Sequence, residues 1–232
     1  MSLYASLATR GTSPALTWYD SDGRLELSGK VLANHVAKIA NYLRDEFGLE
    51  PGEHVALDLP LHWKTLAWAL GALVAGLEVH DAVAQVPAAG ATGNHAGAAG
   101  EAGPAGPASD LASDLVVTNH PERWAESAAE VVALNLDSFA FAWNGDLPAG
   151  VADGLADVMG QPDALVLAEE TDNAERARGG KVIERASVLV KPTVAEATRA
   201  LLAASAGGAA IVVVGEGDPA RIVAAERAQI LP

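Results

Sequence analysis

Apolar residues in the first part of the chain recur at the spacing of strands and then at the spacing of a helix. Two short strand-like runs within 14–28 flank the turn sequence Ser21-Asp22-Gly23, which predicts a β-hairpin. After Ser28, whose hydroxyl suits a helix N-cap, apolar residues return every three or four positions in one stripe: Leu32, Val36, Ile39, Leu43 and Phe47. This stripe predicts a helix that stops at Gly48, since glycine suits the left-handed conformation that ends many helices.

The next segment has the pattern of a strand, a helix and a second strand. Residues 55–59 predict a short buried strand, and 62–75 predict a helix that is apolar nearly all round and therefore deeply buried. Residues 78–80 predict the start of another strand. Because a helix and not a hairpin joins these strands, we expect them to pair in parallel.

Further strands and helices are predicted in the second half of the chain. The expected strands lie at 114–118, 131–136, 164–168, 188–190 and 209–214. The expected helices lie at 121–129, from Thr193 (in a capping box with Glu196) to about Ala206, and from Asp218-Pro219 onward. Residues 137–162, which contain several Gly and Pro, are predicted to be irregular.

Residues 87–108 interrupt this pattern, because 18 of the 22 residues are Ala, Gly or Pro. Such a segment has too little side chain to bury to offset its ordering entropy. We expect a flexible surface excursion within one α/β domain that spans 1–232, with a mainly parallel sheet flanked by helices.

Four segments in order resemble a known enzyme superfamily. They read LELSGKVLANHVAKIANYLRDEFGL, EPGEHVALDLP, WKTLAWALGALVAGLEV and DLVVT, and the later stretch ALLAASAGGAAIVVVGEGDPARIVAAERAQI is also compatible. This arrangement resembles the first part of the large N-terminal domain of acyl-adenylate-forming (AMP-binding, acyl-CoA synthetase-like) enzymes. The resemblance implies the fold of the first subdomains of that domain.

The chain departs from that family where the family binds nucleotide. The family's phosphate loop is rich in Ser, Thr and Gly and ends near a lysine, whereas the sequence after the expected strand 164–168 reads EETDNAE over 169–175. Four carboxylates there oppose a polyphosphate by like-charge repulsion. Gly179-Gly180-Lys181 is either a remnant of that loop or an ordinary loop. We expect the family's adenine and ribose motifs, and the C-terminal domain with its catalytic lysine, to have no counterpart.

Acidic residues outnumber basic ones by 30 to 15, a net charge of −15. A surface of this sign repels polyanions, so we expect neither nucleic acid nor an anionic membrane as a partner. The chain has no cysteine, which excludes disulfides and thiolate sites. Its apolar runs are shorter than the roughly 18–20 residues that span a bilayer, and no signal peptide is recognisable, so we expect a soluble cytoplasmic protein.

Other possible sites have a plain structural interpretation beside the functional one. Gly215-Glu216-Gly217-Asp218-Pro219-Ala220 matches a dinucleotide fingerprint, but its carboxylates and proline favour an ordinary strand–helix turn. Ser205 lies in a loose nucleophile-elbow pattern at the end of a helix, where a strand should precede it. His80-Asp81 is either an acid–base pair or a strand-end hydrogen bond. Trp143 is either a surface binding residue or part of the packing.

The histidines at 35, 54, 62, 80, 95 and 120 include no two within one helical turn, so no HExxH-like metal site exists. We therefore assign no catalytic, cofactor-binding or metal-binding residue and no cofactor. The favoured function is a non-catalytic relative of acyl-CoA synthetases that acts as a binding or regulatory module, with another protein or an acyl/adenylate-type small molecule as partner. The alternatives are an acyl-adenylate-forming ligase or nucleotide-binding subunit that needs a partner chain, and a nucleotide-binding protein that uses 215–220.

Overall fold

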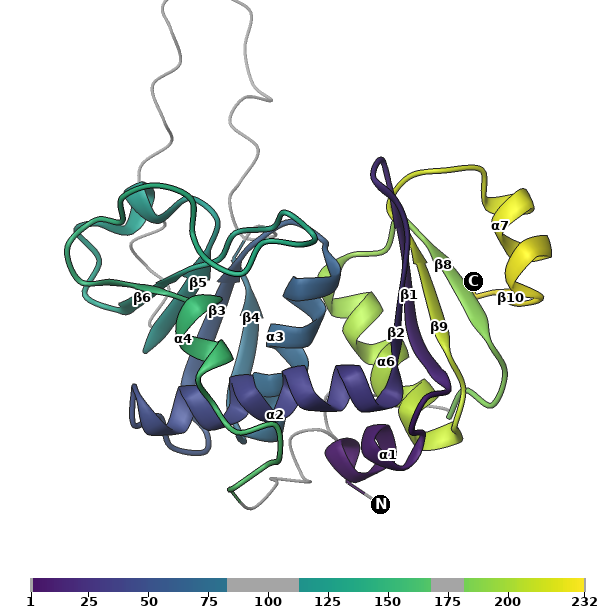
Figure 1. The fold of residues 1–232 in the computed structure, drawn as a ribbon, viewed down its shortest axis with the longest axis horizontal. Coiled ribbons are helices and arrows are strands. Elements are labelled where there is room, and N and C mark those ends of the chain that lie inside the picture. The colour runs from purple at the N-terminus through teal and green to yellow at the C-terminus, as the bar shows by residue number, and fades with distance from the viewer. Residues whose placement is uncertain (1, 83–112, 168–181, 232) are drawn as a thin grey trace, which may run out of the picture.

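The structure, a computed structural model, describes residues 2–82, 113–167 and 182–231 (Figure 1). The Ala/Gly/Pro-rich excursion predicted at 87–108 lies outside these residues. So do the acidic run 169–175 and Gly179-Gly180-Lys181.

The first sheet, sheet A, joins the two ends of the chain. Its strands are β1 (Pro14–Asp20), β2 (Gly23–Ser28), β8 (Ser187–Val190), β9 (Ile211–Val214) and β10 (Gln229–Ile230), in the order β10-β8-β9-β1-β2. The hairpin β1–β2 is antiparallel, as its turn sequence predicted, and the other pairs are parallel. The parallel pairing of β1 with β9 places Leu16 opposite Ile211. A strand near the start of the chain is therefore hydrogen-bonded to a strand near its end.

The second sheet, sheet B, is parallel throughout its described strands. These are β3 (His54–Asp58), β4 (Glu78–Asp81), β5 (Leu115–Thr118), β6 (Glu130–Ala133) and β7 (Val151–Asp153), in the order β4-β3-β5-β6-β7. The parallel pairing expected from the strand–helix–strand pattern is confirmed. The division into two sheets depends on long-range pairing, which the local pattern does not specify.

Helices fill the space between the two sheets, and one packs on the other face of sheet A (Figure 1). The helices are α1 (Leu3–Thr9), α2 (Gly29–Asp45), α3 (Trp63–Val74), α4 (Ala156–Met159), α6 (Val194–Gly207) and α7 (Pro219–Glu226), with a 3₁₀ turn η2 (Pro121–Trp124). Figure 1 shows α3 and α6 between the sheets, with α2 running across from one sheet towards the other. Among the described residues, no helix has the length and apolarity to cross a membrane.

Helix α3 forms the centre of the core, and all of its residues are buried, as its all-round apolar pattern predicted. It packs closely on α2 because Gly71 has no side chain: a Cβ there would lie 2.5 Å from Ile39 Cγ2. The predicted caps are also confirmed. The Ser28 hydroxyl accepts from the backbone N–H of Val31, and Thr193 forms a reciprocal capping box with Glu196.

Some predicted elements are wrong. Residues 164–167, the described part of the strand predicted at 164–168, are irregular. The buried Asn41 side chain, and not a neighbouring strand, binds the backbone of this segment. Its Nδ2 donates to the Ala164 carbonyl (3.0 Å), and its Oδ1 accepts from the Val166 N–H (3.1 Å). This side-chain pairing satisfies the backbone groups without a sheet.

Other differences concern short elements with weak local signals. The helix predicted at 121–129 is only the 3₁₀ turn η2, and the region 137–162, predicted irregular, contains β7 and α4. Helix α1 and strand β10 were not predicted. Four of these five elements are at most four residues long, and α1 spans seven residues. Periodicity is hard to detect in segments this short.

Candidate functional site

An apolar pocket of about 170 Å³ opens between α2, α3 and the segment that carries α4. Its lining comes from three parts of the chain: His35 and Ile39; Trp63, Lys64, Ala67 and Trp68; and Ser138, Phe139, Ala140, Phe141, Gly154, Leu155, Val158 and Met159. An engineered cavity of roughly 150 Å³ with apolar walls holds benzene. The pocket is therefore large enough for a small aromatic ring or a short alkyl chain.

The helical walls of the pocket follow from helix periodicity. His35 and Ile39 are four residues apart on α2, and Trp63, Ala67 and the neighbouring Lys64 and Trp68 recur at the same spacing on α3. Residues four apart on a helix lie on one face. The two helices therefore present matched stripes, and the small Ala67 leaves room between the larger indoles.

Lys64 is a buried cation and the only charged residue of α3. Its Nζ donates to the backbone carbonyls of Asn135 (2.9 Å), Asp137 (2.6 Å) and Ala140 (3.3 Å). Burial lowers the pKa of Lys64 to about 8, an effect that the nearby Asp137 carboxylate opposes. These three bonds hold the loop that carries Phe139 and Phe141 against the end of α3. Lys64 is not among the site residues predicted from the sequence, although it is the only charged residue of α3 and so carries a usable signal.

The mouth of the pocket is apolar and open to solvent. The side chains of Phe139, Phe141 and Met159 are 78%, 73% and 51% exposed. Large aromatic residues are rarely left this exposed in one place without a binding role. The exposed rim therefore makes the pocket a candidate binding surface.

The lining residues also include two polar aromatic groups, the His35 ring and the Trp63 indole N–H, in addition to the Lys64 ammonium and the Ser138 hydroxyl. The His35 ring packs edge-on against Trp63 at 5.4 Å, and burial, followed by the charges of Lys64 and Lys38, lowers the pKa of His35. The indole N–H of Trp63 is buried and has no hydrogen-bond partner among the described residues. A pocket with mostly apolar walls, whose lining includes one residue with an unpaired donor and a cation already bonded to three carbonyls, suits an apolar ligand that carries an oxygen acceptor.

A second cavity is larger, about 780 Å³, but its wall is more highly charged. It lies beside β8, β10 and α6, and its lining includes Glu184, Arg185, Lys191, Glu196 and Arg199. It also borders residue 182, where the described part of the chain resumes. Its mixed positive and negative side chains suit an apolar ligand less well than the walls of the first pocket do.

The dinucleotide-like segment 215–220 forms the turn between β9 and α7. Gly217 has a φ of +122°, and the Asp218 side chain caps α7 by accepting from the Ala220 N–H (3.0 Å). A carboxylate thus occupies the helix N-terminus at which a pyrophosphate would bind. This geometry is that of the plain strand–helix turn.

The remaining sequence candidates are dispersed. Ser205 is buried within α6, which continues to Gly207, and Trp143 is half-buried. His80 and Asp81 are successive residues of β4 and point to opposite faces of the sheet, so they do not form an acid–base pair. The other tryptophans are buried as expected for core residues: Trp18, Trp63, Trp68 and Trp124.

Comparison with known proteins gives one informative sequence relative. No protein-family model matches the chain. A Mycobacterium tuberculosis protein named "TIGR03089 family protein" is 32% identical over an alignment of 232 positions, which covers 90% of this chain and 86% of that protein.

Solved structures of acyl-CoA synthetases and related ligases share the fold. An acyl-CoA synthetase from Brucella canis has a TM-score of 0.67 at 17% identity, over 98% of this chain and 46% of that chain. Coronafacic acid ligase from Pectobacterium brasiliense has a TM-score of 0.61 at 10% identity, over 97% and 47%. The N-terminal domain of FACL13 from Mycobacterium tuberculosis has a TM-score of 0.53 at 13% identity, over 98% and 61%.

The resemblance to acyl-adenylate-forming enzymes and the α/β fold that it implied are therefore confirmed. This chain spans just under half the length of the full synthetase and ligase chains.

Proposed function

Because this chain belongs to the TIGR03089 family, whose name specifies no activity, we propose its function from the apolar pocket: a non-catalytic cytoplasmic binding module that holds an acyl or aryl group. The observation that carries the proposal is the pocket between α2 and α3 with its exposed rim of Phe139, Phe141 and Met159. The names of the solved relatives, an acyl-CoA synthetase and an acid ligase, support an acyl-type ligand.

The size and chemistry of the pocket narrow the ligand class. A volume of about 170 Å³ accommodates about six carbon atoms, judged by the cavity that holds benzene. The unpaired N–H of Trp63 would be satisfied by the carbonyl or carboxylate oxygen of such a group. A hexanoyl or benzoyl group meets both requirements.

The non-catalytic assignment is supported by how the reactive side chains are engaged. The Lys64 ammonium already donates to three carbonyls, and His35 packs against an indole. The acidic run 169–175, a feature of the sequence, disfavours a bound polyphosphate. The proposed role is therefore to bind the acyl group, not to activate it.

Titration of the protein with hexanoate and benzoate, followed by tryptophan fluorescence and calorimetry, tests the proposal. Burying the four methylenes and the methyl group of hexanoate at about 0.8 kcal/mol each gives about 4 kcal/mol, which corresponds to a Kd of about 1 mM. Trp63 and Trp68 line the pocket, so their emission should change on binding.

The matched variants are a Phe139→Ser/Phe141→Ser double change and Val166→Ser. All three side chains are at least 73% exposed, but Val166 is not among the pocket residues. We expect the double change to weaken binding at least threefold and Val166→Ser to leave it unchanged. If neither acid binds at 10 mM, or both variants bind as the wild type does, the pocket is not the site. Binding of Mg-ATP below about 100 μM would instead favour the nucleotide-binding ligase alternative.

A further inference from the structure

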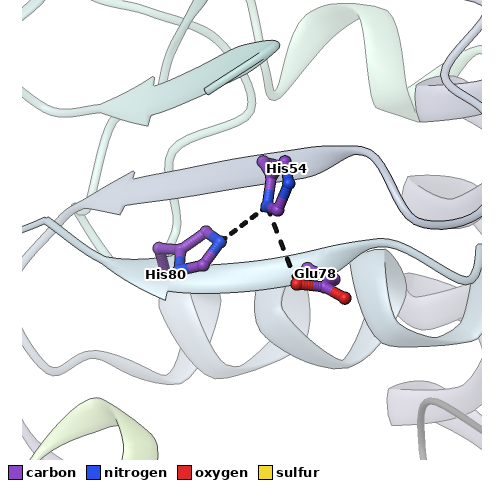
Figure 2. A group of neighbouring side chains, drawn as sticks. All are labelled: His54, Glu78 and His80. Atoms are coloured by element: carbon purple, nitrogen blue, oxygen red, sulfur yellow. Dashed lines mark hydrogen bonds and ion pairs between the residues drawn. The ribbon is translucent and has the colours of Figure 1, made fainter. Parts of the chain in front are cut away.

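Three side chains with metal-binding atoms meet on the exposed edge of sheet B. His54 begins β3, and Glu78 and His80 lie on β4, the edge strand. The parallel register places His54 opposite Glu78 and Ala56 opposite His80. Because alternate residues of a strand share a face, the three side chains project from the same side, as Figure 2 shows.

The face that carries them is the one opposite α3. Val55 and Leu57 point into the main core with the residues of α3, whereas Ala56 belongs to a separate small cluster with Trp124 and Val131. The side chains of His54 and Glu78 are 39% and 49% exposed. An ion could therefore reach the cluster from solvent and retain bound water.

The distances between the donor atoms match those around one ion. His54 Nδ1 lies 2.8 Å from His80 Nε2 and 3.8 Å from Glu78 Oε2, and all three donor atoms lie within 4.8 Å of one another. With metal–ligand bonds of about 2.0–2.1 Å, neighbouring ligand atoms lie about 2.9 Å apart at a right angle and about 3.4 Å apart at the tetrahedral angle. The observed separations bracket these values, so small side-chain rotations would complete the geometry.

We propose that His54, Glu78 and His80 bind a divalent transition-metal ion of the zinc class, with water in the remaining positions. Two imidazoles and a carboxylate are a donor set that suits Zn²⁺, Ni²⁺ and Cu²⁺ and not Mg²⁺ or Ca²⁺.

The electrostatic surroundings also favour a cation. The Asp114 carboxylate lies beside the cluster and accepts from the His54 backbone N–H at 2.7 Å, and the chain as a whole carries a net charge of −15. The ion would link β3 to β4 through side chains, in addition to the backbone pairing at the sheet edge. Its effect on the protein would be to stabilise this edge strand.

The test is a calorimetric titration of the chelator-treated protein with ZnCl₂, together with the visible absorption of the Co²⁺-loaded protein. We expect one ion per chain with a Kd below about 10 μM. Zinc at 100 times the Kd should also raise the Tm by about 5–10 °C, because the ion binds the folded state.

The variants His54→Ala and His80→Ala should each weaken zinc binding by more than about tenfold, since even the loss of an outer-shell partner costs that much. His120→Ala is the matched control, because His120 is exposed and pairs with a single carboxylate, Glu122, at 3.5 Å. Without metal, all three variants should have the same Tm as the wild type, which would show that they fold. Unchanged zinc affinity in His54→Ala or His80→Ala would overturn the proposal, and so would no binding by the wild type at 100 μM.

Discussion

Asp58 ends strand β3 and holds together a buried hydrogen-bond network at the carboxyl edge of sheet B. Its Oδ2 accepts from Thr118 Oγ1 (2.9 Å) and from Trp124 Nε1 (2.8 Å), and Arg123 lies 3.5 Å away. Asp58, Thr118 and Trp124 are each at most 6% exposed. Replacement of Asp58 by alanine would leave two buried donors without an acceptor.

The magnitude follows from those two donors. A buried polar group left unsatisfied costs about 1–3 kcal/mol, so Asp58→Ala should lower the free energy of unfolding by about 2–5 kcal/mol. For a chain of this size, each kcal/mol shifts the Tm by about 2–4 °C. Asp58→Asn keeps one oxygen acceptor and loses the charge, so its loss should be smaller, about 1–2 kcal/mol.

Urea unfolding followed by circular dichroism measures these changes, with an unchanged m-value as the check that the compactness of the end states is preserved. Asp146→Ala is the control, because Asp146 is exposed and should change stability by less than about 0.5 kcal/mol. A double-mutant cycle that combines Asp58→Ala with Trp124→Phe isolates the energy of the hydrogen bond between Trp124 Nε1 and Asp58 Oδ2. If Asp58→Ala is as stable as Asp146→Ala, the network does not stabilise the fold and the reasoning is refuted.

Two further predictions concern the core. Burial, followed by the charge of Lys64, lowers the pKa of His62 to about 4. The unfolded chain therefore takes up the proton first, and the stability present above about pH 6.5 falls as the pH drops towards 4, by about 2 kcal/mol at pH 5. His62→Asn keeps a cap for α3 and should flatten this dependence in urea titrations at pH 5 and 7; an unchanged slope would contradict the assignment. Gly71→Ala would place a Cβ 2.5 Å from Ile39 Cγ2 and should cost about 1–3 kcal/mol in the same assay. Gly160→Ala, at a φ of −72°, should remain near the wild type, and equal stability of both variants would show that α2 and α3 pack more loosely than described.

Local periodicity was enough to predict most of the larger elements. The stripe of α2, the all-round apolar helix α3 and the capping box of α6 each carry their own signal within a few turns. The pairing of β1 with β9 carries no such signal, because the partners are almost 200 residues apart in sequence. The division of the strands into two sheets therefore became visible only in three dimensions.

The candidate sites were harder to predict for a related reason. The pocket needs a wall from residues 138–159, which the sequence indicated only as irregular. His54 and His80 are 26 residues apart, and only the register of β3 with β4 brings their rings together. A search for histidines within one helical turn cannot find a site that is built across two strands.

The pocket proposed to bind an acyl group and the segment expected to bind nucleotide lie in different parts of the chain. The resemblance to adenylate-forming enzymes implies that nucleotide contacts would come from the loop after the strand expected at 164–168. In this structure, residues 164–167 are bound by Asn41 and are not part of a sheet. The pocket is lined instead by α2, α3 and the segment 138–159, and its lining includes no residue of 164–167, although Asn41 holds that segment from the same helix α2. Loss of the phosphate-binding chemistry would therefore leave the pocket intact. The proposed binding role therefore requires the pocket alone and no bound polyphosphate.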